Sequence, residues 1–494
     1  MLSVVSRVKS VLLSATVNMD FSTLTFLFVF FPTFLTIWIV SRPEFRPVII
    51  LLSSLIFIYL GSVDALIPLM ILTVIGYGLG RAVEVSKRTG KFPSFVLWIG
   101  IVLILAVLFF QKWWIAHGVE GASKETVDIL SMLPVLGLSY VAFQMISYLV
   151  DISRGSIPAE TNIFKLGSYL LFFPKLVSGP LMRYKSFRDQ ISNLTPSLED
   201  TAAGIRRILS GVVKRLLIAN QLGLVANSVF GLDAPNIQPH FAWLGLIAYT
   251  FQIYFDFSGY TDIAIGLGRM MGMTLPENFN FPYIAQSIGD FWRRWHMTLS
   301  AWFREYVFFP LERRRTLLNP QQVNMLIVFL LTGLWHGLTL NFIIWGGIHG
   351  IAIALESLGG GKWMKSVWQP IRHLTTMVLV MLGWIFFRSN SLEFAFGFIG
   401  RLFGNIEGIT PLPFSQTTPL PFVEPSFIII LIFAAISSLP ISVIWNNVRK
   451  RFADKPYALL LFQIAEDVLL VGLFVLAVAS SLSGSFQPNI YAKF

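Results

Sequence analysis

Cysteine is absent from the 494-residue chain, and charged residues make up only 13% of it. The absence of cysteine excludes disulfides, cysteine-ligated metals, thiolate nucleophiles and palmitoylation of the chain. A soluble domain carries roughly 25% charged residues. A chain with 55% hydrophobic residues and a mean hydropathy of +0.70 cannot cover its apolar surface in the same way. The composition therefore excludes a soluble globular protein and predicts an integral membrane protein with many spans.

Positive charge is in excess, because 37 Lys and Arg residues outnumber 26 Asp and Glu residues and give a net charge of +11. In a soluble protein this excess would suggest nucleic acid. Here the basic residues cluster between apolar runs, as in Arg81–Lys91 and Arg313–Arg315. Such clusters are typical of cytoplasmic loops that face anionic lipid. The excess of basic residues is therefore explained by the membrane topology, and no nucleic-acid partner is expected.

Long apolar runs are frequent. A span needs about 20 mostly apolar residues to cross a hydrocarbon core about 30 Å thick. The segments that approach this length are Leu24–Val40, Pro47–Leu60, Ala65–Leu79, Ser94–Phe110, Leu130–Val150, Phe164–Val177, Ile208–Phe230, Trp243–Leu267, Val323–Leu340, Ile343–Ala354, Thr375–Phe387, Phe427–Ile444 and Leu459–Ser481. Because several are short, we expect about ten to twelve true spans, with the short segments packed against neighbours or re-entrant.

The segment Pro282–Arg315 is amphipathic rather than uniformly apolar, and it begins PYIAQSIGDFWRRWH. Its charged side chains lie among aromatic residues and include Arg293, Arg294, Arg304 and Glu305. Charged groups at lipid depth are costly, so they should face protein or water. We expect an interfacial or re-entrant helical segment on the cytoplasmic side; a simple amphipathic surface helix is the alternative.

Histidine is rare, with six in the chain, and His336 lies in the apolar stretch VFLLTGLWHGLTLNFIIWGG. An ionisable residue in such a stretch is a functional hypothesis by default. Gly333 and Gly337 flank His336 and would let another backbone approach it. The alternative is a core histidine bonded to a carbonyl. His349 would lie about 20 Å away along one straight helix and on a different face, so the two histidines cannot share one reacting group unless the chain breaks between them. His349 is expected to be structural.

Two further groups of polar residues can each be interpreted in two ways. His296 ends the run FWRRWH, whose guanidinium groups could bind an anionic group or could be interfacial anchors. Asp256 and Asp262 lie six residues apart in YFDFSGYTDIAIGLG, and so on different faces of a helix. They predict either a cation site in an ion or solute transporter, or local hydrogen bonding in a glycine-broken helix.

Three ordered segments, Phe251–Tyr283, Phe291–Leu311 and Thr332–Gly350, resemble the membrane-bound O-acyltransferase family. They are most similar to its bacterial branch, which includes alginate O-acetylases and the teichoic-acid D-alanylation enzymes. The likeness extends to Gly137–Gly155, Phe172–Tyr184 and Gly383–Ala395. It implies three regions: an N-terminal extension over residues 1–20, a transmembrane catalytic core over 21–403, and a C-terminal loop with the last transmembrane helices over 404–494.

The resemblance implies an all-α integral membrane fold, with a ring of helices around a thin central region pierced by a tunnel. His336 matches the family's catalytic histidine in its WHG motif. His296 matches the histidine that ends the family's W-x-R-W-H segment and lines the same tunnel. The expected substrate-binding residues neighbour these two histidines: Trp335, Asn341, Arg293 and Arg294. No metal site is expected.

The activity implied by the resemblance is O-acetylation of an exported polysaccharide such as alginate. The donor would be a cytoplasmic thioester, acetyl-CoA, used as a substrate with no cofactor bound. Expected partners are the lipid bilayer, the exported polysaccharide and an extracytoplasmic acyltransferase- or esterase-like protein. The alternative is D-alanyl or other acyl transfer from an acyl carrier protein to teichoic acid or another envelope polymer. The implied location is the bacterial cytoplasmic (inner) membrane.

Overall fold

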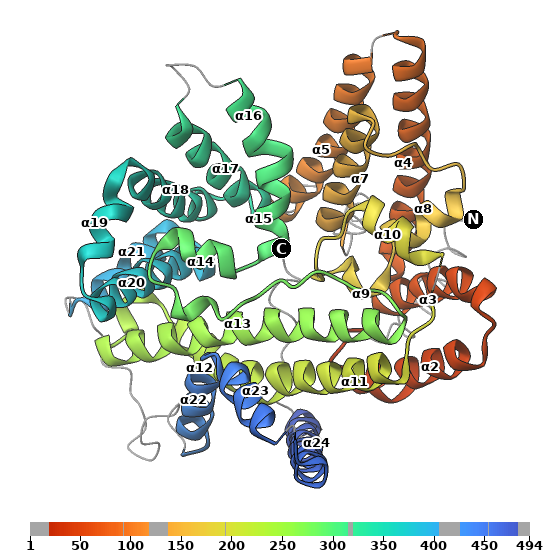
Figure 1. Ribbon diagram of the computed structural model, residues 1–494. Helices are drawn as coiled ribbons and strands as arrows, with labels where there is room; N and C mark the ends of the chain where they lie inside the picture. The colour runs from red at the N-terminus through yellow and green to blue at the C-terminus, as the bar shows by residue number, and fades with distance from the viewer. Residues whose placement is uncertain are drawn as a thin grey trace, which may run out of the picture. The chain divides into compact units, whose positions relative to one another are not determined.

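The computed structural model describes residues 19–91, 93–117, 137–192, 194–314, 320–404, 425–452 and 454–482, and every regular element in these ranges is a helix (Figure 1). Seven of the described helices are long and apolar enough to cross a membrane. Two shorter apolar helical stretches add to them, Phe26–Val40 and Pro425–Ser437. The expected all-α membrane class is confirmed. Fewer helices of spanning length occur in the described residues than the expected ten to twelve or so. Residues 1–18 of the expected N-terminal extension lie outside the described residues.

The chain forms two compact units, and each is assembled from separate stretches of sequence. Among the described residues, the first unit comprises 19–208 and 260–276, and the second comprises 209–259 and 277–482. Two helices contribute a part to each unit: α11 (Leu198–Val212) and α13 (Pro239–Met270). Every residue expected to act in catalysis or substrate binding lies in the second unit.

The first unit is built from the N-terminal helices. Besides its parts of α11 and α13, its α-helices are α2 (Phe31–Val40), α3 (Arg46–Gly61), α4 (Val63–Thr89), α5 (Pro93–His117), α7 (Leu138–Arg154), α8 (Ile163–Leu170), α9 (Phe173–Leu176) and α10 (Tyr184–Ile191). Helices α4, α5 and α7 pack side by side (Figure 1). α4 ends at Gly90, whose left-handed φ of 68° closes the helix after the basic residues Lys87 and Arg88.

The apolar segment Phe164–Val177 forms two short helices in place of a single span. The Asn162 side chain begins α8 by accepting hydrogen bonds from two backbone N–H groups. The chain then turns before α9, where Pro174 occupies the first turn and its missing N–H removes no helical hydrogen bond. Nearly all of these residues are buried, so the segment fills the interior of the first unit.

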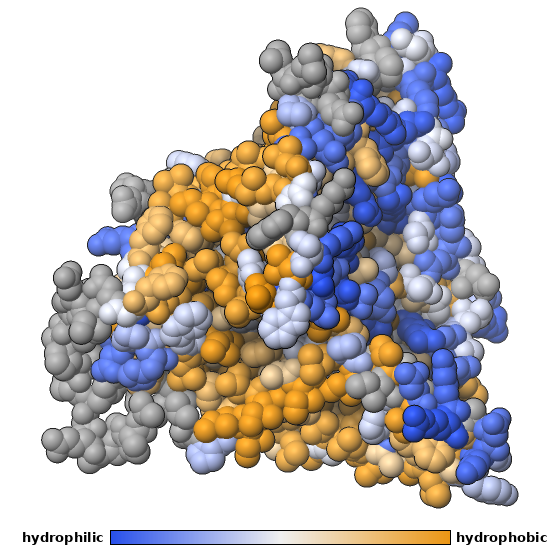
Figure 2. Space-filling view, turned by 60° about the vertical axis from the view of Figure 1, so that its left-hand side comes forward, coloured by the Kyte–Doolittle hydropathy of each residue, from blue (hydrophilic) through white to orange (hydrophobic). Residues whose placement is uncertain are grey.

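The second unit holds the remaining α-helices. They are α12 (Asn220–Phe230), α14 (Ile288–Arg294), α15 (Met297–Phe303), α16 (Phe309–Arg313), α17 (Gln321–His336), α18 (Leu340–Leu355), α19 (Gly361–Ser366), α20 (Gln369–Arg388), α21 (Leu392–Leu402), α22 (Pro425–Ser437), α23 (Ile441–Arg451) and α24 (Pro456–Ser480). α18 packs against both α17 and α20, and these three helices expose Leu331, Ile351 and Leu374. Figure 2 turns their side forward and shows a largely hydrophobic face, as a lipid-facing surface requires.

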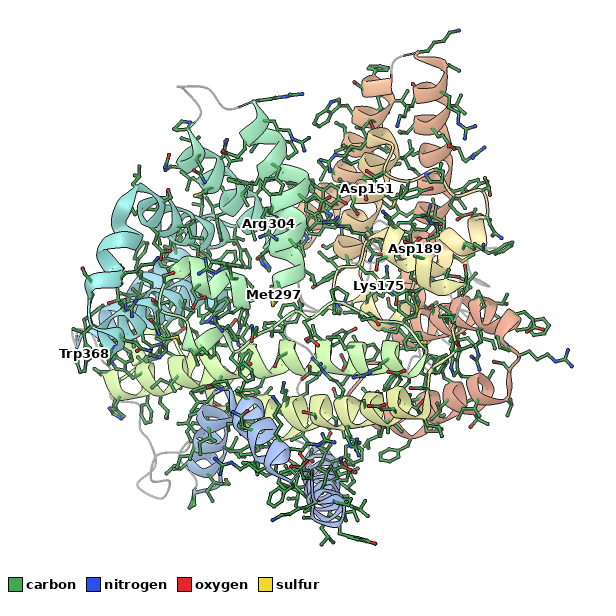
Figure 3. The ribbon with its side chains drawn as sticks, in the orientation of Figure 1. Asp151, Lys175, Asp189, Met297, Arg304 and Trp368 are labelled. Carbon is green, nitrogen blue, oxygen red and sulfur yellow. The ribbon has the colours of Figure 1, made fainter. Side chains whose placement is uncertain are left out.

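The amphipathic segment Pro282–Arg315 is a series of short helices. After α14 the chain breaks at Trp295 and His296 and continues as α15, a π-helical turn (Arg304–Phe308) and α16. Met297 and Arg304, labelled in Figure 3, begin α15 and the π-helical turn. Phe291, Trp292 and Leu299 are buried. The segment is therefore broken and packed into the second unit, and it is not the continuous surface helix of the alternative interpretation.

Candidate active site

Helices α17 and α18 form a tight hairpin that places His336 at its turn. A Cβ atom on Gly333 would lie 2.3 Å from the Phe342 carbonyl oxygen, and one on Gly346 would lie 2.4 Å from that of Phe329. Only glycine permits this backbone approach. The expectation that Gly333 lets another backbone come close is confirmed. The chain breaks between α17 and α18, so His336 and His349 do not share one straight helix.

Substitution of Gly346 by alanine is expected to lower the free energy of unfolding by about 1–3 kcal/mol, because the added methyl would push the two helices apart. The matched control is its neighbour Gly347, where an added Cβ meets nothing within 4 Å. Gly347→Ala should leave stability unchanged or slightly raised, since alanine is the better helix former. Thermal unfolding in detergent measures both variants. Equal effects of the two substitutions would contradict the close crossing.

His336 is the last residue of α17 and is 5% exposed. Four aromatic rings surround its imidazole, at centroid distances of 4.4 Å for Trp335, 4.9 Å for Phe387, 5.1 Å for Trp345 and 6.2 Å for Phe342. Trp345 and Phe387 lie edge-to-face with the imidazole. These rings come from α17, α18 and α20. They hold the imidazole in a water-poor environment, in which interactions with a polar reacting group are stronger than in water.

His296 lies in the break between α14 and α15 with a left-handed φ of 43°, a strained backbone for a non-glycine residue. Its Nδ1 is 3.1 Å from the Asn278 side-chain oxygen, which also accepts from the Thr298 N–H. Because that oxygen acts as an acceptor, Nδ1 carries the proton and Nε2 presents its lone pair. Burial lowers the pKa of His296 to about 3, so the ring is neutral at neutral pH.

Trp335 connects the two histidines. Its ring centroid lies 4.4 Å from that of His336 and 6.3 Å from that of His296. The structure therefore brings the two predicted catalytic residues to the same indole, although they are on separate helical segments. Residues 278–280 support this arrangement, because backbone hydrogen bonds join them to Arg294 and Met297 on either side of His296.

The other expected substrate-binding residues make contacts within the protein. Asn341 is buried, and its Nδ2 donates to the Ser389 carbonyl at 2.6 Å, which ties the start of α18 to the end of α20. Arg294 pairs with Asp290 and donates to the Asn280 carbonyl, so it steadies the loop beside His296. The Arg293 side chain, 69% exposed, lies 3.4 Å from the same aspartate.

The two aspartates considered as a cation site are each paired with an arginine. Asp256 accepts from Arg215 Nε at 3.0 Å in a buried pair, within the second unit. Asp262 lies 2.8 Å from Arg207, within the first unit. A carboxylate already neutralised by a guanidinium is a poor ligand for a metal cation. No group of three His, Asp or Glu in the described parts of the chain could hold a metal ion.

Several residues that build the site were not predicted from the sequence. Asn278, which fixes the tautomer of His296, and Phe387, which packs on His336, are distant in sequence from their partners. Trp345 carried one local signal, since it lies four residues before His349 on α18 and so on the same helix face. Its contact with His336 depends on the hairpin.

Comparison with known proteins identifies the class. The model of the membrane-bound O-acyltransferase family matches residues 50–387. "Probable alginate O-acetylase AlgI" of Pseudomonas aeruginosa is 37% identical over 393 residues, which cover 78% of this chain and 75% of that protein. "Peptidoglycan O-acetyltransferase" of Helicobacter pylori is 31% identical over 76% of this chain and 78% of its own length. "Teichoic acid D-alanyltransferase" of Bacillus subtilis is 31% identical over 61% and 78%, respectively. The chain is therefore a multi-pass membrane O-acyltransferase that belongs to the membrane-bound O-acyltransferase family.

Proposed function

We propose that this enzyme transfers an acetyl group from a cytoplasmic acetyl thioester to an acceptor hydroxyl on the outer side of the membrane, as a step in the O-acetylation of an exported envelope polysaccharide, with His336 as the general base. The observation that carries the proposal is the position of His336 at the turn of the α17–α18 hairpin, buried among aromatic rings and joined to His296 through Trp335. The similarity to alginate O-acetylases supports an acetyl group and a polysaccharide such as alginate.

The proposed reaction uses one proton acceptor and needs no covalent intermediate on the enzyme. His336 takes the proton of the acceptor hydroxyl as its oxygen attacks the thioester carbonyl carbon, and a tetrahedral intermediate forms. The carbon–sulfur bond then breaks, and the departing thiolate takes the proton from His336. Imidazole suits both steps, because its ordinary pKa of about 6.5 lies close to neutral pH. The chain has no cysteine that could carry the acyl group as a thioester.

The remaining predicted residues take distinct roles in this proposal. His296 accepts a hydrogen bond from a second donor group of the acceptor molecule through Nε2, which its bond to Asn278 leaves unprotonated, and so orients the acceptor toward His336. Trp335 forms the wall that both imidazoles share. Asn341 and Arg294 act indirectly, because they fix the start of α18 and the loop beside His296.

His296→Asn is expected to lower kcat by roughly 10²-fold, because it removes the Nε2 acceptor that orients the acceptor molecule toward His336. Asparagine tolerates the left-handed backbone at this position, so the fold should persist. The control is His373→Asn on α20, where Nδ1 of the imidazole lies 3.1 Å from the Ala285 backbone carbonyl oxygen. The kcat of each purified variant is measured in a steady-state acyl-transfer assay. Equal kcat for His296→Asn and the wild type would remove His296 from the mechanism.

The proposed donor is acetyl-CoA, which reacts as a substrate and leaves as free coenzyme A, so no cofactor remains bound. The enzyme would work in the bacterial inner membrane with an extracytoplasmic acyltransferase- or esterase-like protein that completes transfer to the polymer. The second candidate is D-alanyl transfer from an acyl carrier protein, which the 31% identity to a teichoic acid D-alanyltransferase favours.

The two candidate functions predict different esters on the exported polymer: acetyl esters for the first and D-alanyl esters for the second. Cells that lack the enzyme and then receive the wild-type gene should regain hydroxylamine-sensitive acetyl esters on the polysaccharide. The same cells with His336→Ala, at equal protein level, should not. Base-labile D-alanine in place of acetate would establish the second candidate. Acetyl esters at the wild-type level with His336→Ala would contradict the catalytic assignment.

A further inference from the structure

His349 lies in a cluster of three buried rings whose polar atoms have no hydrogen-bond partner within the described residues. Neither ring nitrogen of His349 has a partner, and the same holds for the indole nitrogens of Trp292 and Trp345. The three side chains are 0%, 7% and 1% exposed, respectively. The His349 centroid lies 5.3 Å from each indole, edge-to-face, and the two indoles lie 5.8 Å apart. We call these three side chains the aromatic box.

The aromatic box is unfavourable for stability. A buried polar group without a partner costs roughly 1–3 kcal/mol. An apolar side chain such as leucine would fill a similar volume at position 349 without that cost. Buried polar groups without a hydrogen-bond partner are expected mainly at functional sites. A structural role alone does not explain why an imidazole occupies the position.

Residues of α14 and α20 outside the aromatic box also hold the His349 ring closely. The Phe291 ring on α14 stacks on it at 6.3 Å with an interplanar angle of 10°. On α20, a Cβ atom at Gly383 would come within 2.9 Å of His349 Nε2. The imidazole is therefore fixed by α14 on one side and by the glycine of α20 on another. A fixed ring can orient the side chain that it touches.

That neighbour is Trp345, which packs on both histidines. Trp345 and His349 lie four residues apart on α18, and their rings meet at 5.3 Å. The same indole lies edge-to-face with His336 at 5.1 Å. His349, Trp345 and His336 thus form a continuous row of ring contacts from the box to the proposed catalytic base.

We propose that His349 is a positioning residue for acyl transfer: its imidazole sets the orientation of the Trp345 indole, and that indole aligns His336 with the reacting hydroxyl. This inference rests on the proposed function of His336. It assigns His349 no contact with the substrate. A small displacement of a catalytic group is enough to lower the rate by up to about 10²-fold, which gives the scale of the expected effect.

His349→Leu tests the proposal, because it keeps the volume and removes the unpartnered nitrogens. The expected result is a fall in kcat of at least tenfold, with the KM for donor and acceptor unchanged and the unfolding temperature unchanged or raised. A purely structural histidine would give no kcat effect at preserved stability. The control is the exposed His240, for which His240→Leu should change neither kcat nor stability.

Two further variants keep the test decisive. Gly383→Ala leaves His349 in place but presses a methyl group against Nε2, so it should lower kcat in the same way even if His349→Leu fails to fold. Trp345→Phe should abolish the additional effect of His349→Leu, because His349 acts through Trp345. Independent, multiplicative effects of the two substitutions would overturn the proposal, as would wild-type kcat for folded His349→Leu or Gly383→Ala.

The outcome for His336→Ala separates this inference from the proposed function. If His336→Ala is inactive and His349→Leu is fully active, only the positioning role fails. If His336→Ala retains wild-type activity, the catalytic assignment fails, and the positioning role fails with it.

Discussion

Replacement of His336 by alanine is expected to lower kcat for acyl transfer by roughly 10²–10⁴-fold, the usual contribution of a general base. The reason is that no other described side chain holds an imidazole at this point of the α17–α18 hairpin. The KM for the thioester should change little, because the aromatic rings around position 336 remain. Steady-state kinetics of the purified enzyme in detergent, with thiol release and ester formation followed together, measures the effect.

Two controls make this result specific. His240→Ala removes an exposed histidine and should keep full activity. The unfolding temperature of His336→Ala should stay near that of the wild type, which would exclude loss of fold as the cause. A kcat within threefold of the wild type at normal stability would mean that His336 is not the base.

Asp256→Asn is expected to lower the free energy of unfolding by about 3–5 kcal/mol, because it leaves the buried Arg215 without its countercharge. The side chains of Arg215 and Asp256 are only 2% and 8% exposed, and Nε lies 3.0 Å from the carboxylate. Removing both charges should be far milder, so Arg215→Met combined with Asp256→Leu is expected to recover much of the loss. Denaturant or thermal unfolding in detergent provides the measurement.

The matched control is the exposed ion pair between Arg269 and Asp200, whose side chains are 52% and 41% exposed. Asp200→Asn should change stability by less than about 1 kcal/mol. An equally small effect for Asp256→Asn would contradict a structural ion pair. Together with a cation-dependent rise in the stability of the wild type, such a result would revive the transporter interpretation of Asp256 and Asp262.

The membrane class and most helix positions follow from composition and apolar run length, because lipid imposes the same demand on every span. The breaks inside apolar runs do not follow in this way. Phe164–Val177 has the hydropathy of a short span, but Pro174 and the turn before it divide the run into two packed helices. In Pro282–Arg315, amphipathic composition indicated irregular structure. The break at His296 itself depends on hydrogen bonds with residues 278–280.

The same distinction between local signals and tertiary contacts applies to the residues of the site. His336, and the close approach allowed by Gly333, could be predicted because both signals are local to one apolar stretch. The partners Asn278, Phe387 and Arg215 could not be predicted, because each meets its counterpart only after separate segments fold together. The two-helix hairpin also changes the interpretation of His349. A residue set aside as remote from His336 along one helix proves to share the Trp345 ring with it.

The most direct test of the central claim is transfer across a bilayer by the reconstituted enzyme. Proteoliposomes would enclose the acceptor polysaccharide with its extracytoplasmic partner and receive acetyl-CoA labelled in the acetyl group only on the outside. Only enzyme molecules whose cytoplasmic side faces outward are exposed to the donor. We predict hydroxylamine-sensitive label on the enclosed polymer with the wild-type enzyme and none with His336→Ala. Equal labelling by the two proteins, or label that remains outside with the active wild type, would contradict the account.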